Sequence, residues 1–83
     1  MKNNAITSKQ CSAARALLGW SRKKLAVNAS VSERTVIDFE RGARKTYEMT
    51  IHAIRSAFED GGIEFIDGNG GGVGVRFSEP PPD

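Results

Sequence analysis

Residues 31–42 read VSERTVIDFERG and mix apolar with hydrogen-bonding side chains. The apolar side chains of Val31, Val36 and Phe39 are five and then three positions apart, which places them on one face of a helix. The positions between them carry Ser32, Glu33, Arg34, Thr35 and Asp38. With Ser32 as its N-cap and Gly42 after its end, the segment predicts a short helix with one buried face and one face rich in hydrogen-bonding groups.

Two helices are predicted before this segment. Thr7 and Gln10 have the spacing of a capping box, and the helix that follows spans about residues 8–18 until a glycine ends it. Its inner face is expected to hold Cys11, Ala14, Leu17 and Leu18. Ser21 can cap a second, shorter helix that ends near residues 29–31. Its inner face is expected to hold Leu25, Ala26 and Ala29.

A fourth helix is predicted after the quoted segment. Thr46 can cap it, and Gly61 and Gly62 end it. Its apolar residues step by four, three and four positions, and they are Tyr47, Ile51, Ile54 and Phe58. The first 62 residues therefore indicate a mainly α domain.

Beyond Gly62 the pattern changes from helical to extended. Residues 63–66 form a β-rich run, and residues 67–72 are a turn of Gly, Asn and Asp. The apolar residues after this turn alternate with others, and they are Val73, Val75 and Phe77. The sequence therefore predicts a helical domain over 1–62, a small β-hairpin over 63–77 and a disordered, proline-rich tail over 78–83.

Length and charge limit the possible functions. With 83 residues the chain forms one small domain, for which a partner subunit is a reasonable expectation. Residues 1–58 hold eleven of the twelve Lys and Arg against four acids, about +7, and residues 59–83 hold six acids against Arg76, about −5. A basic body suggests a polyanion partner, although a solvated surface with segregated charge is an equal alternative. One cysteine, no signal peptide and no long apolar run indicate a soluble, cytoplasmic protein.

The residue types do not support catalysis or metal binding. Cys11 and His52 are the only thiol or imidazole ligands, fewer than a closed zinc site needs. The stretch GNGGGVG lacks both the spacing and the lysine of a phosphate-binding loop. Glu59 and Asp60 are adjacent on a helix, where their side chains diverge. We expect no enzymatic activity and no cofactor.

The short break between the second and third predicted helices suggests a steep crossing at Ala26. The third helix would then project from the body with its N-terminal half uncovered. An α-helix fits the DNA major groove, and its first turn needs side chains that match the donors and acceptors of base edges. The polar residues of the quoted segment supply such groups.

The stretch from Ser12 to Gly42 resembles the lambda-repressor-like, or Xre-like, helix-turn-helix family. The resemblance is carried by ARALLGWSRKKLAVNASVSERTVIDFERG and covers about residues 7–60. It implies a four- to five-helix DNA-binding domain, here followed by the hairpin, that acts as a transcriptional regulator and binds double-stranded DNA as a homodimer. It also implies a structural ion pair between Arg15 and Glu40. The chain departs from the family at Ser30, where the turn usually has glycine.

The family resemblance also implies roles for individual residues. Base-reading positions correspond to Ser32, Glu33, Arg34 and Asp38, and Arg34 is the best candidate to bind a guanine through two hydrogen bonds. Phosphate-binding positions correspond to Arg22, Lys23, Thr35, Arg44 and Lys45. Glu33 could accept a hydrogen bond from a cytosine, and Thr35 could instead contact a thymine methyl group.

Several residues keep a purely structural alternative. Glu33 can simply favour the positive end of its helix. Trp20 and Tyr47 are expected in the core or at helix ends rather than as stacking platforms. For the whole chain, the alternative function is an antitoxin or adaptor that binds another protein through its C-terminal strands. The hairpin over 63–77 is expected to be the dimer contact, unless it only caps the core of the monomer.

Overall fold

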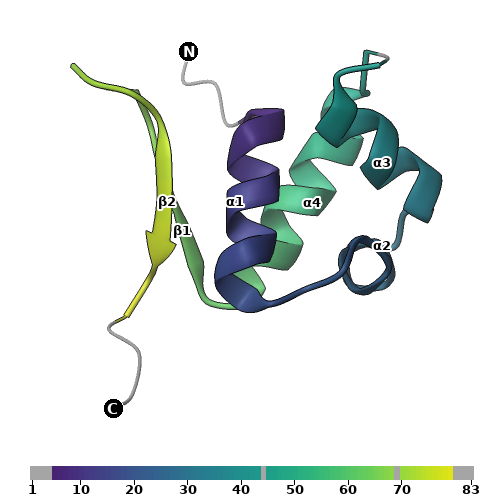
Figure 1. Cartoon of the computed structure of the whole chain (residues 1–83), viewed down its shortest axis with the longest axis horizontal. Helices are drawn as coiled ribbons and strands as arrows, with labels where there is room; N and C mark the ends of the chain where they lie inside the picture. Colours follow the sequence, from purple (N-terminus) through teal and green to yellow (C-terminus); the bar gives the residue numbers. More distant parts are fainter. Residues whose placement is uncertain (1–4, 44, 69, 80–83) are drawn as a thin grey trace.

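The computed structural model describes residues 5–43, 45–68 and 70–79, which form four helices and a two-stranded antiparallel hairpin. The elements are α1 (Ser8–Leu18), α2 (Arg22–Ala29), α3 (Glu33–Arg41), α4 (Glu48–Asp60), β1 (Ile63–Ile66) and β2 (Gly74–Phe77). Figure 1 shows α1 and α4 in the middle of the molecule, with α2 and α3 on one side and the hairpin on the other. The mainly helical class and the C-terminal hairpin are as the sequence predicts.

The first three helices begin at the predicted caps. The Thr7 hydroxyl accepts a hydrogen bond from the Gln10 backbone N–H at 3.0 Å, and the Gln10 amide oxygen accepts one from the Thr7 N–H at 2.9 Å. The Ser21 hydroxyl accepts from the Lys24 N–H in the same way. These contacts satisfy amide groups that a helix N-terminus leaves without an intrahelical partner. The capping box is confirmed.

The start of α4 differs from the prediction. Its N-cap is Tyr47 rather than Thr46, and the Tyr47 side chain makes no capping hydrogen bond. Tyr47 has an extended backbone (φ −61°, ψ 143°), so helical spacing does not yet apply at this position. Tyr47 is 84% exposed, so the prediction that it lies on the inner face of α4 is wrong. Of the two positions expected for it, the core or a helix end, the structure shows the helix end.

All four helices and the hairpin contribute to one core. The largest fully buried side chains are Phe58, Leu25, Ile54, Ile63, Val36 and Cys11. Trp20 stacks on Phe58 with ring centroids 5.6 Å apart, so the core interpretation of Trp20 is confirmed. A Cβ atom at Gly61 would lie 2.9 Å from this indole, which explains the glycine there. Leu17, expected inside, is 40% exposed because it points to a different side of α1 from the buried Cys11 and Ala14 and the half-buried Leu18.

The hairpin is built into this core. Its register pairs Ile63 with Phe77 and Phe65 with Val75, so these four side chains share the face that packs on the helices. β2 begins at Gly74, one residue later than the predicted apolar alternation, and Val73 is 49% exposed.

Hydrogen bonds hold both ends of the hairpin in place. The Gln10 side-chain amide donates to the carbonyl groups of Gly74 at 2.9 Å and Ile66 at 3.3 Å, in addition to its role in the capping box. The Ser78 N–H donates to the carbonyl of Gly62 at 2.9 Å. The predicted disordered tail therefore starts too early, because Ser78 is held against the end of α4. The rest of that prediction concerns 80–83, which lie outside the described residues.

None of the helices in the described part of the chain has the length and apolar character needed to cross a membrane.

Candidate nucleic-acid interface

The turn between α2 and α3 determines how α3 projects from the body. Ser30 ends α2 in the left-handed conformation (φ 58°, ψ 40°). The N–H groups of Ser30 and Val31 donate back to the carbonyls of Val27 and Ala26. A residue with a side chain costs about 1 kcal/mol in this conformation compared with glycine, so the turn keeps the geometry that favours glycine and carries some strain.

α3 has one buried side and one polar side, as the sequence predicts. Val36 and Phe39 face the core, at 0% and 8% exposure. The first residues on the other side, Ser32, Glu33 and Arg34, are exposed. Figure 1 shows α3 at the edge of the molecule, away from the hairpin. The polar side of α3 therefore faces outward.

Two of the expected DNA-contacting hydroxyls also stabilise the start of α3. The Ser32 hydroxyl accepts a hydrogen bond from the Thr35 backbone N–H at 3.0 Å. The same oxygen lies 2.7 Å from the Thr35 hydroxyl, so the two side chains form one small network. A Ser N-cap stabilises a helix by about 1 kcal/mol. Ser32 and Thr35 thus have a structural role independent of any ligand.

An ion pair on the outer side of α3 joins two of the expected base-reading residues. Arg34 Nε lies 3.3 Å from Asp38 Oδ1, one helical turn further on. The Arg34 side chain is 72% exposed and the Asp38 side chain only 15%. Asp38 is thus the fixed member of the pair, and Arg34 is the accessible one.

A buried carboxylate connects α3 to α1 and α2. The Glu40 side chain is 2% exposed, and the Arg15 guanidinium binds both of its oxygens, Nε to Oε2 at 2.6 Å and Nη2 to Oε1 at 2.9 Å. Arg15 also donates to the carbonyl of Trp20 at 3.1 Å. The ion pair expected between Arg15 and Glu40 is therefore present, in the two-bond geometry that gives such pairs their strength.

Two more residues donate to Glu40. Arg22, at the start of α2, places its Nε 3.0 Å from Oε1. The thiol of Cys11 donates to Oε2 at 3.2 Å. The sequence predicts a phosphate contact for Arg22 and a core position for Cys11, and it predicts neither hydrogen bond to Glu40. The cluster Cys11, Arg15, Arg22 and Glu40 fixes the angles between α1, α2 and α3.

The charges in this cluster shift its pKa values in a consistent way. Burial would raise the pKa of Glu40, but hydrogen bonds from Arg15, Arg22 and Cys11 outweigh burial and hold this pKa below its usual value. The hydrogen bond to Glu40 raises the pKa of Arg15. Burial, together with the neighbouring carboxylate, raises the pKa of the Cys11 thiol far above its usual value. Glu40 is therefore ionised, and Cys11 is a neutral thiol rather than a reactive thiolate.

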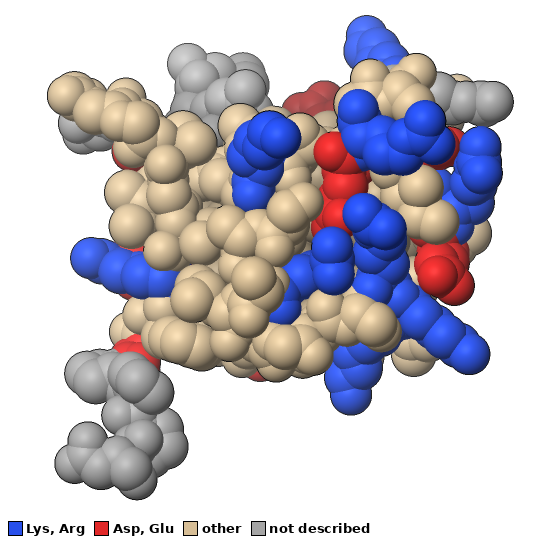
Figure 2. Space-filling view, in the orientation of Figure 1, with Lys and Arg blue, Asp and Glu red and all other residues tan. Residues whose placement is uncertain are grey.

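Basic side chains surround the outer side of α3. Figure 2 shows most Lys and Arg on the half of this face that holds α2 and α3, with acidic atoms among them. The exposed basic residues on these elements and the loop that follows are Arg22, Lys23, Lys24, Arg34, Arg41 and Lys45. Arg44, an expected phosphate contact, lies outside the described residues. Such an arrangement can neutralise phosphates on both sides of a helix placed in a groove.

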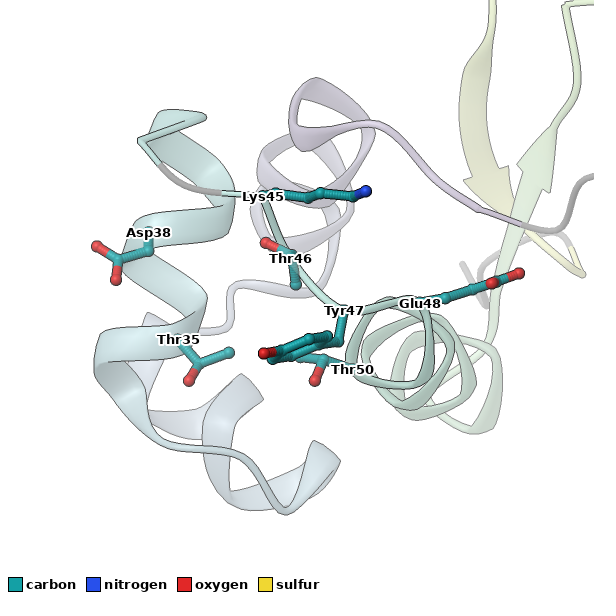
Figure 3. A pocket seen from close by; sticks show the side chains of 7 residues that line it. All are labelled: Thr35, Asp38, Lys45, Thr46, Tyr47, Glu48 and Thr50. Atoms are coloured by element: carbon teal, nitrogen blue, oxygen red, sulfur yellow. The ribbon is translucent and has the colours of Figure 1, made fainter.

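A surface hollow of about 670 Å³ separates α3 from the start of α4. Its lining residues are Thr35, Asp38, Lys45, Thr46, Tyr47, Glu48 and Thr50. Figure 3 shows the Tyr47 ring pointing from the start of α4 toward α3, and the Asp38 carboxylate pointing away from α4. Tyr47 was not among the predicted site residues. Its position directly after the basic loop, at the start of α4, is the sequence signal for an exposed side chain.

Neither a metal site nor a similarity to known proteins indicates the function of this chain. No group of three or more His, Cys, Asp or Glu side chains able to hold a metal is found among the residues that the structure describes. Neither the comparison with protein-family models nor the comparison with curated proteins finds a match to this chain.

Proposed function

We propose that this chain is a sequence-specific, DNA-binding transcriptional regulator of the Xre-like helix-turn-helix type. One observation carries the proposal: α3 exposes a polar first half while its last turn is fixed to α1 and α2 by the buried Glu40 cluster. A helix held rigidly from behind and uncovered in front has the arrangement that major-groove recognition requires.

In the proposed complex, the outer side of α3 enters the major groove. Arg34 reads a guanine through its terminal nitrogens, and Glu33 accepts from a cytosine amino group. Arg22 and Lys23 bind phosphates on one side of the groove, and Lys45 binds them on the other. Phosphate contacts fix the register of the helix, whereas base contacts determine which sequence is preferred.

The charge arrangement supports DNA over an alternative protein partner for this face. The exposed side of α2 and α3 carries mainly basic side chains around one exposed valine, Val27, whereas the hairpin exposes Ile66 and Val73 next to or in its turn. Apolar surface and sheet edges are the features of a protein contact. We therefore assign DNA to α3 and a second copy of this chain to the hairpin.

The dimer is part of the proposal because of the geometry of DNA. Recognition helices of two-fold dimers bind half-sites that are one turn of the duplex, about 34 Å, or a multiple of it apart. Pairing between hairpins of two subunits would hide the sheet edge and place one α3 on each side of the two-fold axis. The hairpin also contributes Ile63 and Phe65 to the monomer core. In this proposal it therefore both completes the core and forms the dimer contact.

A salt titration of DNA binding tests the proposal. The logarithm of the binding constant should fall with the logarithm of salt concentration, with a slope of about −0.9 for each phosphate neutralised. A slope of about −3 or steeper agrees with three to four phosphate contacts per subunit. The absence of measurable binding to any duplex at low salt, with a folded protein, would contradict it.

A further inference from the structure

The ion pair between Arg34 and Asp38 lies on the outer side of α3, with Arg34 Nε 3.3 Å from Asp38 Oδ1. We propose that Asp38 is a positioning residue, which holds the Arg34 guanidinium in the orientation that reads guanine. The DNA site of this chain would then contain one guanine in each half-site whose selection depends on Asp38. This inference rests on the proposed function and specifies which base the site requires.

Helix stability does not explain the pair. Arg34 precedes Asp38 by four residues, which is the less favourable order for oppositely charged residues on a helix. Asp38 also lies in the last turn of α3, where the helix dipole disfavours an acidic side chain. Ion pairs with an exposed member contribute little to folding.

DNA affinity does not explain Asp38 either. The phosphates of DNA repel a carboxylate, so an acid on the DNA-facing side lowers binding to every sequence. Figure 3 shows the Asp38 carboxylate on the outer side of α3 rather than toward α4. An acidic residue that lowers the affinity for DNA of every sequence is best explained at this position if it increases the discrimination between bases.

The geometry fits such a role. Asp38 contacts Arg34 through Nε, on one edge of the guanidinium. The end that carries the two terminal nitrogens is the end that matches O6 and N7 of guanine. Because the Asp38 side chain is 15% exposed and the Arg34 side chain 72%, a fixed carboxylate orients an accessible cation. Ordering a flexible side chain before binding lowers the entropy lost in the complex.

The test compares Asp38→Asn with the wild-type full chain. Sites are first selected from random duplexes, and affinities are then measured for the selected site, for single-base changes and for unrelated DNA. Wild type should prefer guanine at the Arg34 position by about 5- to 150-fold, the range for a bidentate contact. In Asp38→Asn this preference should fall by about fivefold or more, while affinity for unrelated DNA rises.

Glu48→Gln is the matched control, because it removes one negative charge at the hollow from a side chain that points away from α3 (Figure 3). It should leave the guanine preference unchanged. A thermal melt of each variant shows whether it is folded, and Asp38→Glu, which keeps the charge, should retain more of the preference than Asp38→Asn. If Asp38→Asn does not fold, Asp38→Glu decides: it keeps the charge but displaces the carboxylate, so the guanine preference should fall below that of wild type, and an unchanged preference would overturn the proposal.

A second comparison separates positioning from direct contact. In an Arg34→Ala background, Asp38→Asn should not change the preference at this base pair. A further change there would show that Asp38 contacts the base itself and would overturn the proposal. So would a guanine preference in Asp38→Asn equal to that of wild type. A wild-type protein that selects no motif would instead contradict the proposed function.

Discussion

Arg15 and Glu40 are 25 residues apart in sequence and form a two-bond ion pair, with Arg15 Nε 2.6 Å and Nη2 2.9 Å from the Glu40 oxygens. The pair joins α1 to the last turn of α3. Because Glu40 is almost completely buried, its charge depends on these partners for stabilisation. The orientation of α3 is therefore coupled to the stability of the whole domain.

Replacing Glu40 should destabilise the fold strongly. In Glu40→Ala the positive charge of Arg15 loses its main partner in a mostly buried position, and breaking a buried pair costs about 3–5 kcal/mol. Chemical denaturation should show this loss as a lower midpoint. Glu64→Gln is the control, because it breaks the exposed cross-strand pair with Arg76 and should change the midpoint little. The paired replacement Arg15→Met with Glu40→Met should recover part of the loss. A Glu40→Ala variant as stable as wild type would contradict the stabilising role of this ion pair.

The same carboxylate should make the domain sensitive to acid. The folded-state pKa of Glu40 is lowered, so its contribution to stability is fully present above the unfolded-state pKa of about 4.3 and is lost as pH falls through the lower folded-state pKa. The free energy of unfolding should therefore decrease below about pH 4. Glu40→Gln, measured at a temperature where it is folded, should show a shallower decrease. Equal pH dependence in both proteins would contradict this role of Glu40.

Arg22 should act on phosphates through the guanidinium that also contacts Glu40. Arg22→Ala should weaken binding to all DNA sequences alike and reduce the magnitude of the salt slope by about one unit. Lys9→Ala is the control, because Lys9 lies at the hollow beside β2 and should leave the slope unchanged. A change of base preference in Arg22→Ala would show that this residue reads sequence instead.

The sequence predicts the local features of this fold well. Thr7 with Gln10, Ser21, Ser32 and Gly42 depend on contacts over three or four residues, and each acts where the pattern places it. The predicted cap at Thr46 is wrong by one residue. A threonine before a helix predicts a cap, and no feature of the sequence distinguishes a helix that starts directly after Thr46 from one that starts a residue later. The helix starts after Tyr47 instead.

Contacts between distant segments were only partly predictable. The pair of Arg15 and Glu40 follows from the family resemblance and not from spacing. The donation by Cys11 and Arg22 to Glu40, and by Gln10 to the hairpin, depends on how helices pack, which helical periodicity does not specify. The pair of Arg34 and Asp38 has the spacing i, i+4 and could have been read from the sequence.

The hairpin should hold two copies of the chain together. Truncation after Gly62 would remove the buried Ile63 and Phe65 and is too severe a test. The substitutions Ile66→Lys and Val73→Lys instead change exposed side chains near the sheet edge, where charge opposes strand pairing. Sedimentation at micromolar concentration should show a dimer for wild type and a folded monomer for the double variant. Val27→Lys, at a more exposed apolar site on α2, is the control and should remain dimeric. A dimer that survives both hairpin substitutions would assign dimerisation to another surface.

Selection of bound duplexes from a random pool tests most directly the central claim that α3 reads DNA. Wild-type protein should enrich two inverted half-sites whose centres are one duplex turn, about 10 base pairs, or a multiple of it apart, each with a strongly preferred guanine. Arg34→Ala should lose the preference at that base pair and about 1–3 kcal/mol of affinity for the selected site. A folded wild-type protein that enriches no sequence, or an Arg34→Ala variant that enriches the same motif with the guanine intact, would contradict the account.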